Sequence, residues 1–361
     1  MIHDVAILPG DGIGPEVVAV AGDVLERVEQ LSGADPGFRL ETIDAGAGRW
    51  RRTGSAFAEE DYQLCRAADA MLLGAMGLPD VRHPDGREAG GDVIFKLRFG
   101  LDLYAGIRPV RRYDGPLSPL RDPGRIDYVI VRENTEGFYA ARPGGSRVAD
   151  DVAADTSIVT RAGTARIARR AFELAERRAG RRSVTSVDKA NVLGSYALWR
   201  TVVERVAAKY PGVELESVYV DAAALYLVLR PASFDVIVAE NMFGDILSDL
   251  GAATIGGLGL APSADLGDEH GLFQPAHGSA PDIAGRGVAN PTATVLAAAM
   301  MLDWLGEQRD DPGATRAARW IETAVREVLA SGHGLTSDLG GDRSTAEAAA
   351  ALLAALDAAA A

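Results

Sequence analysis

The segment FDVIVAENMFGDILSDLGA, residues 234–252, has the pattern of a buried strand that runs into a helix. The β-branched run at 236–238 predicts the strand, and Glu240 ends it. Asp245 and Asp249 lie four residues apart, which places both carboxylates on one face of the predicted helix. Two such charges repel unless a cation lies between them. The pair therefore indicates either a solvated helix face or a site for a divalent ion with oxygen ligands.

The same alternation of short apolar runs and longer helical patterns recurs along the chain. We expect strands at 70–75, 128–133 and 183–188, and helices at 16–31 and 197–210. Strands that alternate with helices are typical of an α/β protein with a largely parallel sheet. The sequence therefore predicts that fold class.

The length and the distribution of these patterns predict two domains. At 361 residues the chain exceeds one ordinary hydrophobic core. Several predicted strands cluster in the middle of the chain, while both ends carry further strand and helix patterns. We expect a large, discontinuous domain from 1–100 plus 256–361 and a small domain from 101–255. Within the small domain, a Gly- and Asp-rich segment at about 140–157 predicts a loop or an extended arm.

The bulk composition restricts the partners and the compartment. A net charge of −14 argues against nucleic acid or an anionic membrane surface as a partner. The one cysteine, Cys65, has no second cysteine with which to form an internal disulfide, which is typical of the reducing cytoplasm. No segment has the ~20 consecutive apolar residues of a membrane helix, and no signal peptide is evident at the start. We expect a cytoplasmic protein with a small-molecule substrate.

The glycine-rich segment PGDGIGPEV at 9–17 follows a predicted strand and opens a helix. Its spacing is G-x-G-x-G rather than the G-x-G-x-x-G of dinucleotide-binding Rossmann folds. No acidic residue ends a second strand at the expected distance. The segment is therefore either a tight structural turn or a phosphate loop.

Three arginines lie among apolar residues, at Arg98, Arg108 and Arg132. Guanidinium groups bind carboxylates through two hydrogen bonds and keep their charge when desolvated. Together they would suit a substrate with two carboxylates, although each alone is compatible with a structural ion pair.

Other polar residues are candidates for proton transfer and ligand binding. Tyr139 and Lys189 could carry protons if burial or a nearby charge shifted their pKa values towards neutrality, and either could instead be structural. Asp221 follows a predicted strand and could add a third carboxylate to the pair at Asp245 and Asp249. The Gly- and Pro-rich segment at 273–291 is typical of a ligand-binding loop.

Taken together, these segments resemble the β-decarboxylating dehydrogenases, which act on isocitrate, 3-isopropylmalate, homoisocitrate, D-malate and tartrate. The motifs that carry the resemblance occur in the expected order and are LPGDGIGPEV at 8–17, LR(x9)RP at 97–109, VRENTEGFY at 131–139, DKANV at 188–192, ENMFGDILSDL at 240–250 and HGSAPDIAG(x4)NP at 277–291. The resemblance implies a two-domain isopropylmalate/isocitrate dehydrogenase-like fold, not a classical Rossmann fold.

The resemblance also implies a reaction and a set of residue roles. The reaction is NAD-dependent oxidative decarboxylation of a 2-hydroxy dicarboxylic acid, aided by Mg²⁺ or Mn²⁺. By resemblance, the substrate carboxylates bind the three arginines named above, and the metal ligands are Asp221, Asp245 and Asp249. Lys189 would accept the hydroxyl proton, and Tyr139 would protonate the enol.

In this family Lys189 and Asp221 would come from the partner subunit, so the resemblance implies a homodimer with shared active sites. The arm at about 140–157 would then be an intersubunit clasp, and 101–255 would be the dimerisation domain. The large domain would bind the cofactor.

The cofactor loop favours NAD over NADP. By resemblance the cofactor-binding residues are His277, Gly278, Ser279, Ala280, Asp282, Ile283 and Asn290. The Asp282 carboxylate would accept hydrogen bonds from the adenosine ribose and would repel a 2′-phosphate. NADP-using relatives have Lys and Tyr where this chain has Asp282 and Ile283. One departure is Gln274, which stands where the family usually has Glu.

The residues before Arg98 favour an apolar substrate substituent. Isocitrate enzymes have Ser and Asn where this chain has Asp92 and Ile94, and homoisocitrate enzymes often have Arg in place of Phe95. Ile94, Phe95 and Val192 predict an apolar pocket, as an isopropyl group requires, while Asp92 would repel a third carboxylate. The best match is a 3-isopropylmalate-like acid, and D-malate, tartrate or isocitrate remain alternatives because such pockets discriminate by only ~1–3 kcal/mol.

A different class of function is a non-catalytic regulatory subunit of the same fold. Such a subunit is expected to lack a metal carboxylate, the lysine or the tyrosine. This chain keeps all of them.

Overall fold

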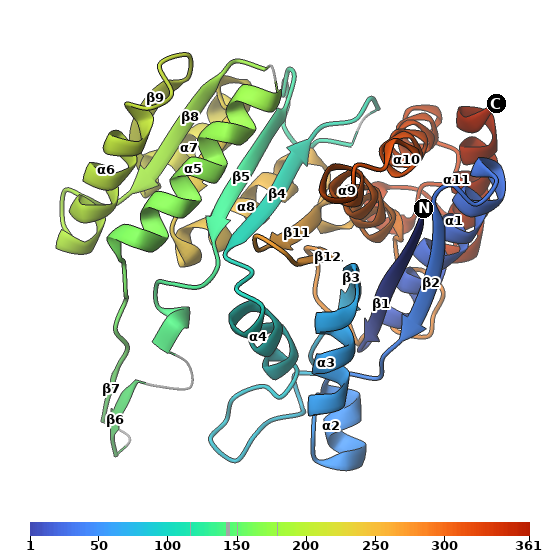
Figure 1. Cartoon of the computed structure of the whole chain (residues 1–361), viewed down its shortest axis with the longest axis horizontal. Helices are drawn as coiled ribbons and strands as arrows, with labels where there is room; N and C mark the ends of the chain where they lie inside the picture. Colours follow the sequence, from blue (N-terminus) through green and yellow to red (C-terminus); the bar gives the residue numbers. More distant parts are fainter. Residues whose placement is uncertain (116, 142–144, 150, 179) are drawn as a thin grey trace. The chain divides into compact units, whose positions relative to one another are not determined.

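The computed structural model describes residues 1–361 except 116, 142–144, 150 and 179. The chain divides into two compact units (Figure 1). Unit 1 consists of Met1–Asp102, Tyr113–Leu117 and Gly256–Ala361, and unit 2 consists of Leu103–Arg112 and Ser118–Ile255.

In the described part of unit 1, the strands lie in the order β2-β1-β3-β12-β11. These strands are β1 (Ile2–Gly10), β2 (Gly37–Thr42), β3 (Ala70–Ala75), β11 (Pro262–Leu266) and β12 (Gly271–Pro275). All neighbours pair in parallel except β11 and β12, which are antiparallel. Every residue of β3 is buried, as is typical of a parallel strand covered on both faces.

The helices of unit 1 are α1 (Gly14–Ser32), α2 (Ala47–Thr53), α3 (Glu59–Ala67), α4 (Gly91–Gly100), α9 (Thr292–Arg309), α10 (Pro312–Ser331) and α11 (Thr345–Ala360). Helix α9 packs against β11 and β12 and against α1 and α10, and its residues 292–299 are all buried. Its run of Ala, Leu and Met explains this central position, because a helix that is apolar all round is stable only when surrounded.

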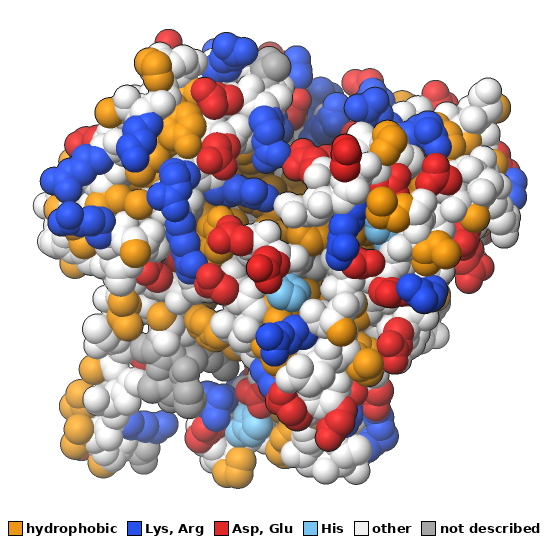
Figure 2. Space-filling view, in the orientation of Figure 1, with side chains coloured by type: hydrophobic (Ala, Val, Ile, Leu, Met, Phe, Trp, Pro, Cys, Tyr) orange, Lys and Arg blue, Asp and Glu red, His pale blue; other side chains and the backbone are white. Residues whose placement is uncertain are grey.

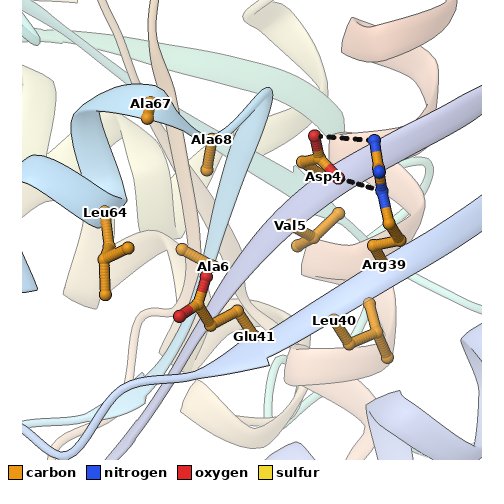
Figure 3. Close-up of a pocket in the computed structure, with 9 residues that line it drawn as sticks. All are labelled: Asp4, Val5, Ala6, Arg39, Leu40, Glu41, Leu64, Ala67 and Ala68. Carbon is orange, nitrogen blue, oxygen red and sulfur yellow. Dashed lines mark hydrogen bonds and ion pairs between the residues drawn. The ribbon is translucent and has the colours of Figure 1, made fainter.

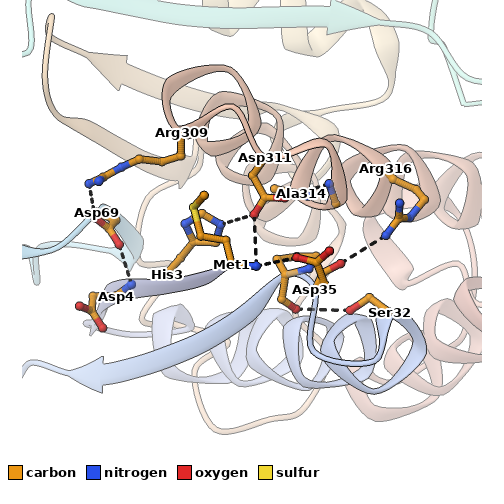
Figure 4. A network of polar contacts seen from close by, with 12 residues as sticks. Met1, His3, Asp4, Ser32, Asp35, Asp69, Arg309, Asp311, Ala314 and Arg316 are labelled. Atoms are coloured by element: carbon orange, nitrogen blue, oxygen red, sulfur yellow. Dashed lines mark hydrogen bonds and ion pairs between the residues drawn. The ribbon is translucent and has the colours of Figure 1, made fainter.

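A polar network joins the start of β1 to α10 (Figure 4). The Nε2 atom of His3 lies 2.9 Å from Oδ2 of Asp311, and both side chains are buried. Asp311 also caps α10, because its carboxylate accepts hydrogen bonds from the backbone N–H groups of Gly313 and Ala314. The network therefore attaches one end of this sheet to the helix layer.

The main sheet of unit 2 has its described strands in the order β4-β5-β10-β8-β9. These are β4 (Ala105–Arg111), β5 (Asp127–Glu133), β8 (Ser183–Asp188), β9 (Glu214–Tyr219) and β10 (Val236–Ala239). Strands β4 and β5 are antiparallel, and the other pairs are parallel. The predicted α/β class with a largely parallel sheet is confirmed.

Helices cover both faces of this sheet (Figure 1). They are α5 (Arg161–Arg178), α6 (Gly194–Ala207), α7 (Val220–Leu229) and α8 (Asn241–Ile255). Helices α5 and α6 pack together on one face, and α7 and α8 pack together on the other. Among the described residues, every helix is too short or too polar to cross a membrane.

The arm predicted at about 140–157 contains a two-stranded antiparallel ribbon, β6 (Ser146–Val148) and β7 (Val152–Ala154). All six of these residues are exposed. Residues 142–144 and 150 of the predicted arm lie outside the described residues. At the base of the ribbon, Gly137 and Ile158 exchange backbone hydrogen bonds of 2.7 and 3.2 Å.

Candidate active site

The carboxyl ends of two neighbouring strands of unit 2 bring Arg132 next to the first turn of α8. Arg132 of β5 pairs in register with Ala239, the last residue of β10, and α8 begins two residues later. Oδ1 of Asn241 accepts hydrogen bonds from Nε and Nη2 of Arg132 at 3.0 and 2.8 Å, and Nη1 donates to Asp245. A Cβ atom on Gly244 would lie 2.8 Å from the Arg132 side chain, so glycine permits this close approach. The guanidinium of Arg132 is therefore held in a fixed orientation.

Tyr139 belongs to the same cluster. It begins the short 3-10 helix Tyr139–Ala141, and its hydroxyl donates to Oδ2 of Asp245 at 3.3 Å. The Arg132 guanidinium carbon lies 5.7 Å from the centre of the Tyr139 ring. Partial burial and the charge of Asp245 raise the pKa of Tyr139, while Arg132 opposes the shift. At neutral pH the phenol therefore keeps its proton and can act as an acid.

Asp249 lies one helical turn beyond Asp245. Its pKa is raised by desolvation and by the negative charge of Asp245, and the cations Arg108 and Arg132 oppose the rise. A divalent cation near both carboxylates would remove their mutual repulsion, and carboxylate oxygens are the ligands that Mg²⁺ and Mn²⁺ prefer. This donor set fits such an ion, with Asp245 and Asp249 as two of its ligands.

Lys189 and Asp221 form a separate pair. Lys189 follows β8, Asp221 lies in the first turn of α7, and Nζ of Lys189 is 2.6 Å from Oδ1 of Asp221. Hydrogen bonding by Lys189 lowers the pKa of Asp221. Within the described residues, no three His, Cys, Asp or Glu side chains gather closely enough to hold a metal ion. Asp221 therefore does not complete a three-carboxylate cluster with Asp245 and Asp249 in the single chain.

The turn that carries Lys189 is held in place by hydrogen bonds to the preceding residue, Asp188. Asp188 is fully buried, and its carboxylate accepts hydrogen bonds from Nε and Nη2 of Arg200, each at 2.8 Å. It also accepts from the backbone N–H of Ala190 at 2.9 Å. These contacts fix the backbone on both sides of Lys189.

The remaining predicted substrate residues lie in different units. Arg98, on α4 of unit 1, is buried and donates from Nε to Asp265 at 2.9 Å. Arg108, on β4 of unit 2, is also buried. Ile94 and Phe95 lie on α4 and are partly exposed, whereas Val192 of unit 2 is 67% exposed.

The predicted cofactor loop follows β12 in unit 1 and packs against the glycine-rich segment at 9–17. The backbone N–H of Ile13 donates to the carbonyl of Ser279 at 2.8 Å. Gly12 has φ +60°, and a Cβ atom there would collide with the Ser279 carbonyl. Ile283 packs on the apolar cluster of Ile13, Val17 and Ala289. The glycine-rich segment therefore forms a tight turn against the cofactor loop, and its role as a phosphate loop stays a prediction.

The Asp11 side chain connects this turn to neighbouring segments. Its buried carboxylate accepts backbone hydrogen bonds from Ala47 at 2.8 Å and from Gly48 and Gly77 at 2.7 Å each. Two of these donors start α2, where unpaired N–H groups attract a negative charge. Asp11 therefore connects three segments of unit 1.

Other members of the cofactor loop differ in their surroundings. Asp282 and Gly278 are exposed. Asn290 is buried, and it accepts from the backbone N–H of Thr292 and donates to Asp338, each at 3.0 Å. Nδ1 of His277 lies 3.0 Å from the Gly278 carbonyl, and burial lowers the pKa of His277. Ala280 has φ +38°.

Unit 1 also has a hollow between β1, β2 and α3, away from these residues (Figure 3). Of the charged residues that line it, Asp4 and Arg39 form an ion pair at 2.6 Å, and Glu41 adds a second carboxylate. On the face drawn in Figure 2, acidic and basic side chains are interspersed, as is typical of a solvated surface.

Comparison with known proteins identifies the family. The family described as "Isocitrate/isopropylmalate dehydrogenase" matches residues 4–352. The chain belongs to this family. A 3-isopropylmalate dehydrogenase of Corynebacterium glutamicum is 45% identical over 90% of this chain and 92% of its own length. A 3-isopropylmalate/3-methylmalate dehydrogenase of Methanocaldococcus jannaschii is 45% identical over 96% of this chain and 97% of its own length.

A solved structure supports the same assignment. The crystal structure of isocitrate dehydrogenase from Methylococcus capsulatus has a TM-score of 0.87 and 38% identity to this chain. The match covers 98% of this chain and 99% of that one. The predicted resemblance and the isocitrate/isopropylmalate dehydrogenase fold are both confirmed.

Two buried carboxylates of this family member were not among the predicted site residues. Burial raises the pKa of Glu133 to about 7, although its carboxylate accepts hydrogen bonds from the backbone N–H groups of Thr135 and Glu136. Burial also raises the pKa of Glu240, which accepts from the Tyr196 hydroxyl at 3.0 Å. The available signal was the position of each residue, because Glu133 ends the strand β5 and Glu240 directly follows β10.

Proposed function

We propose that this chain catalyses the NAD-dependent oxidative decarboxylation of 3-isopropylmalate or a close alkyl-substituted relative, with Mg²⁺ or Mn²⁺. The observation that carries the proposal is the convergence of Arg132, Tyr139 and Asp249 around Asp245. Relatives of known name support the substrate, because several that are 43–47% identical to this chain are named 3-isopropylmalate dehydrogenase.

The residues of this cluster have complementary tasks. Arg132, oriented by Asn241, would bind a substrate carboxylate, with Arg108 supplying a second positive charge. Asp245 and Asp249 would hold the divalent ion, which would act as a Lewis acid towards the substrate oxygen on which negative charge develops. Tyr139 holds a proton on its hydroxyl and would deliver it to carbon after loss of carbon dioxide. NAD would accept the hydride.

We further propose that two copies of the chain complete each site. Beyond Asp221, helix α7 is built of apolar residues and one tyrosine, yet Leu225, Val228 and Leu229 are 53%, 41% and 69% exposed. Ile246 of the neighbouring α8 is 59% exposed. An exposed apolar surface of this kind is typical of a protein interface. A second copy packed there would supply the partner subunit's Lys189 as proton acceptor and the partner subunit's Asp221 as third metal ligand.

The decisive experiment compares substrates and cofactors in steady-state kinetics with Mn²⁺. The substrates are 3-isopropylmalate, 3-methylmalate, isocitrate, homoisocitrate, D-malate and tartrate. We expect the highest kcat/KM with 3-isopropylmalate and NAD, and loss of turnover on addition of a chelator. A wide preference for isocitrate would overturn the interpretation of Asp92, Ile94 and Phe95. An equal or higher kcat/KM with NADP would overturn the interpretation that Asp282 selects NAD. Absence of any turnover would favour a regulatory subunit.

A further inference from the structure

A buried charge cluster in unit 1 joins Arg98 to the strand pair β11–β12. Oδ2 of Asp265 accepts hydrogen bonds from Nε of Arg98 at 2.9 Å and from Nε2 of Gln274 at 3.0 Å. The side chains of Arg98 and Asp265 are 7% and 0% exposed, and Gln274 is 8% exposed. One carboxylate oxygen therefore connects a buried cation to a buried amide.

The strand register explains why these two side chains meet. Ser263 pairs with Gln274, and Asp265 pairs with Leu272, in an antiparallel ladder. Residues 265 and 274 are therefore diagonal neighbours on the same face of the ladder, where long side chains come into contact.

Gln274 adds no charge beside Asp265. The Arg98 guanidinium contacts the Asp265 carboxylate, and the Gln274 amide adds a donor without a charge. A glutamate at 274, which the family usually has there, would place a second carboxylate against Asp265. Two carboxylates at this distance in a buried site do not both ionise without a large penalty. Asp265 and Gln274 are thus a matched pair.

We propose that Asp265 is a positioning residue for Arg98 and that Gln274 is its obligatory neutral partner. The proposal rests on the proposed function, in which Arg98 binds a substrate carboxylate. In the part of the chain that the structure describes, Arg98 donates hydrogen bonds from Nε alone. Asp265 therefore fixes the plane of the guanidinium while its two terminal nitrogens stay available for a bidentate bond with a carboxylate.

The experiment is a double-variant cycle of Asp265→Asn, Gln274→Glu and Asp265→Asn/Gln274→Glu. We measure KM for 3-isopropylmalate, KM for NAD, kcat and the melting temperature, with and without 3-isopropylmalate. Each single variant should raise KM for the substrate at least about tenfold, because one loses the partner of a buried cation and the other adds an opposing charge. KM for NAD should stay within about twofold, since the change acts on a substrate-binding arginine. The double variant restores one carboxylate and one amide, so its substrate KM should return most of the way to the wild-type value.

The outcomes separate positioning from a purely structural role. A structural role alone would lower the melting temperature without a selective change in substrate KM or in the melting shift that the substrate produces. That result overturns the proposal. So does a double variant whose rise in substrate KM equals the product of the two single-variant rises. If Asp265→Asn does not fold, the double variant decides: a folded, active double variant supports the exchange, and an unfolded one overturns it. Failure of the proposed function would appear in the wild-type protein, as absence of turnover before any substitution.

Discussion

Two carboxylate sites of this molecule differ in how their charge is satisfied. Asp11 in unit 1 is 5% exposed and accepts three backbone hydrogen bonds. Asp245 and Asp249 in unit 2 face each other along one helix, and their repulsion contributes to the raised pKa of Asp249. A carboxylate whose hydrogen bonds come from the backbone is part of the fold. Asp245 is paired with Arg132, yet its repulsion of Asp249 remains, and such a pair of carboxylates is suited to bind a cation.

The largest effect of a substitution is expected at Asp249. Asp249→Asn should lower turnover by roughly 10³-fold, because the divalent ion loses a charged ligand. The melting temperature without divalent ions should stay the same or rise, since the repulsion with Asp245 is gone. In the wild type, Mn²⁺ should raise the melting temperature by linkage, and in the variant it should not.

Asp23→Asn is the matched control, because Asp23 is exposed on α1 and the substitution is the same. It should change neither turnover nor the response to Mn²⁺. If Asp249→Asn kept normal turnover, Asp245 and Asp249 would be part of a solvated helix face and not a metal site.

The second effect is expected at Asp11, and it should appear in stability. Asp11→Ala leaves three backbone N–H groups without their acceptor and should lower the free energy of unfolding by about 4 kcal/mol. Asp11→Asn keeps one acceptor oxygen and should lose less. Urea unfolding followed by circular dichroism measures both. Asp11→Ala could instead unfold like the wild type but no longer bind NAD. The segment at 9–17 would then be a ligand site, and Asp11 would not be a residue that stabilises the fold.

Local patterns were sufficient to predict much of unit 2. The β-branched run at 236–238 and the helical spacing of Asp245 and Asp249 predict β10 and α8, because both depend on neighbours within a few residues. Their meeting with Arg132 was also within reach, since the carboxyl ends of adjacent parallel strands lie at one edge of a sheet.

The contacts that distinguish the two carboxylate sites were not predictable from local patterns. The donors to Asp11 lie 36 to 66 residues away in the chain, and Arg98 is 167 residues from Asp265. Neither distance leaves a periodic signal in the sequence. The departure at Gln274 was visible, but its meaning depends on the ladder register that places it beside Asp265.

The smallest effect concerns Glu133, which combines features of both sites. Like Asp11 it accepts backbone hydrogen bonds, and like Asp249 it has a raised pKa, here about 7 against an ordinary value of 4.5. The native state therefore binds a proton more tightly than the unfolded chain does. This stabilisation is complete below about pH 4.5 and is lost as the pH rises to about 7, at a cost of roughly 3 kcal/mol. Glu133→Gln should remove this pH dependence.

The measurement is the free energy of urea unfolding of both proteins at about pH 5 and about pH 8. The difference between wild type and variant isolates Glu133 from every other group that titrates. We expect the wild type to lose more stability than Glu133→Gln between the two pH values. If both proteins lost the same free energy of unfolding between the two pH values, the backbone donors of Thr135 and Glu136 would offset the cost of burying the Glu133 carboxylate. Glu133 would then be a structural carboxylate like Asp11.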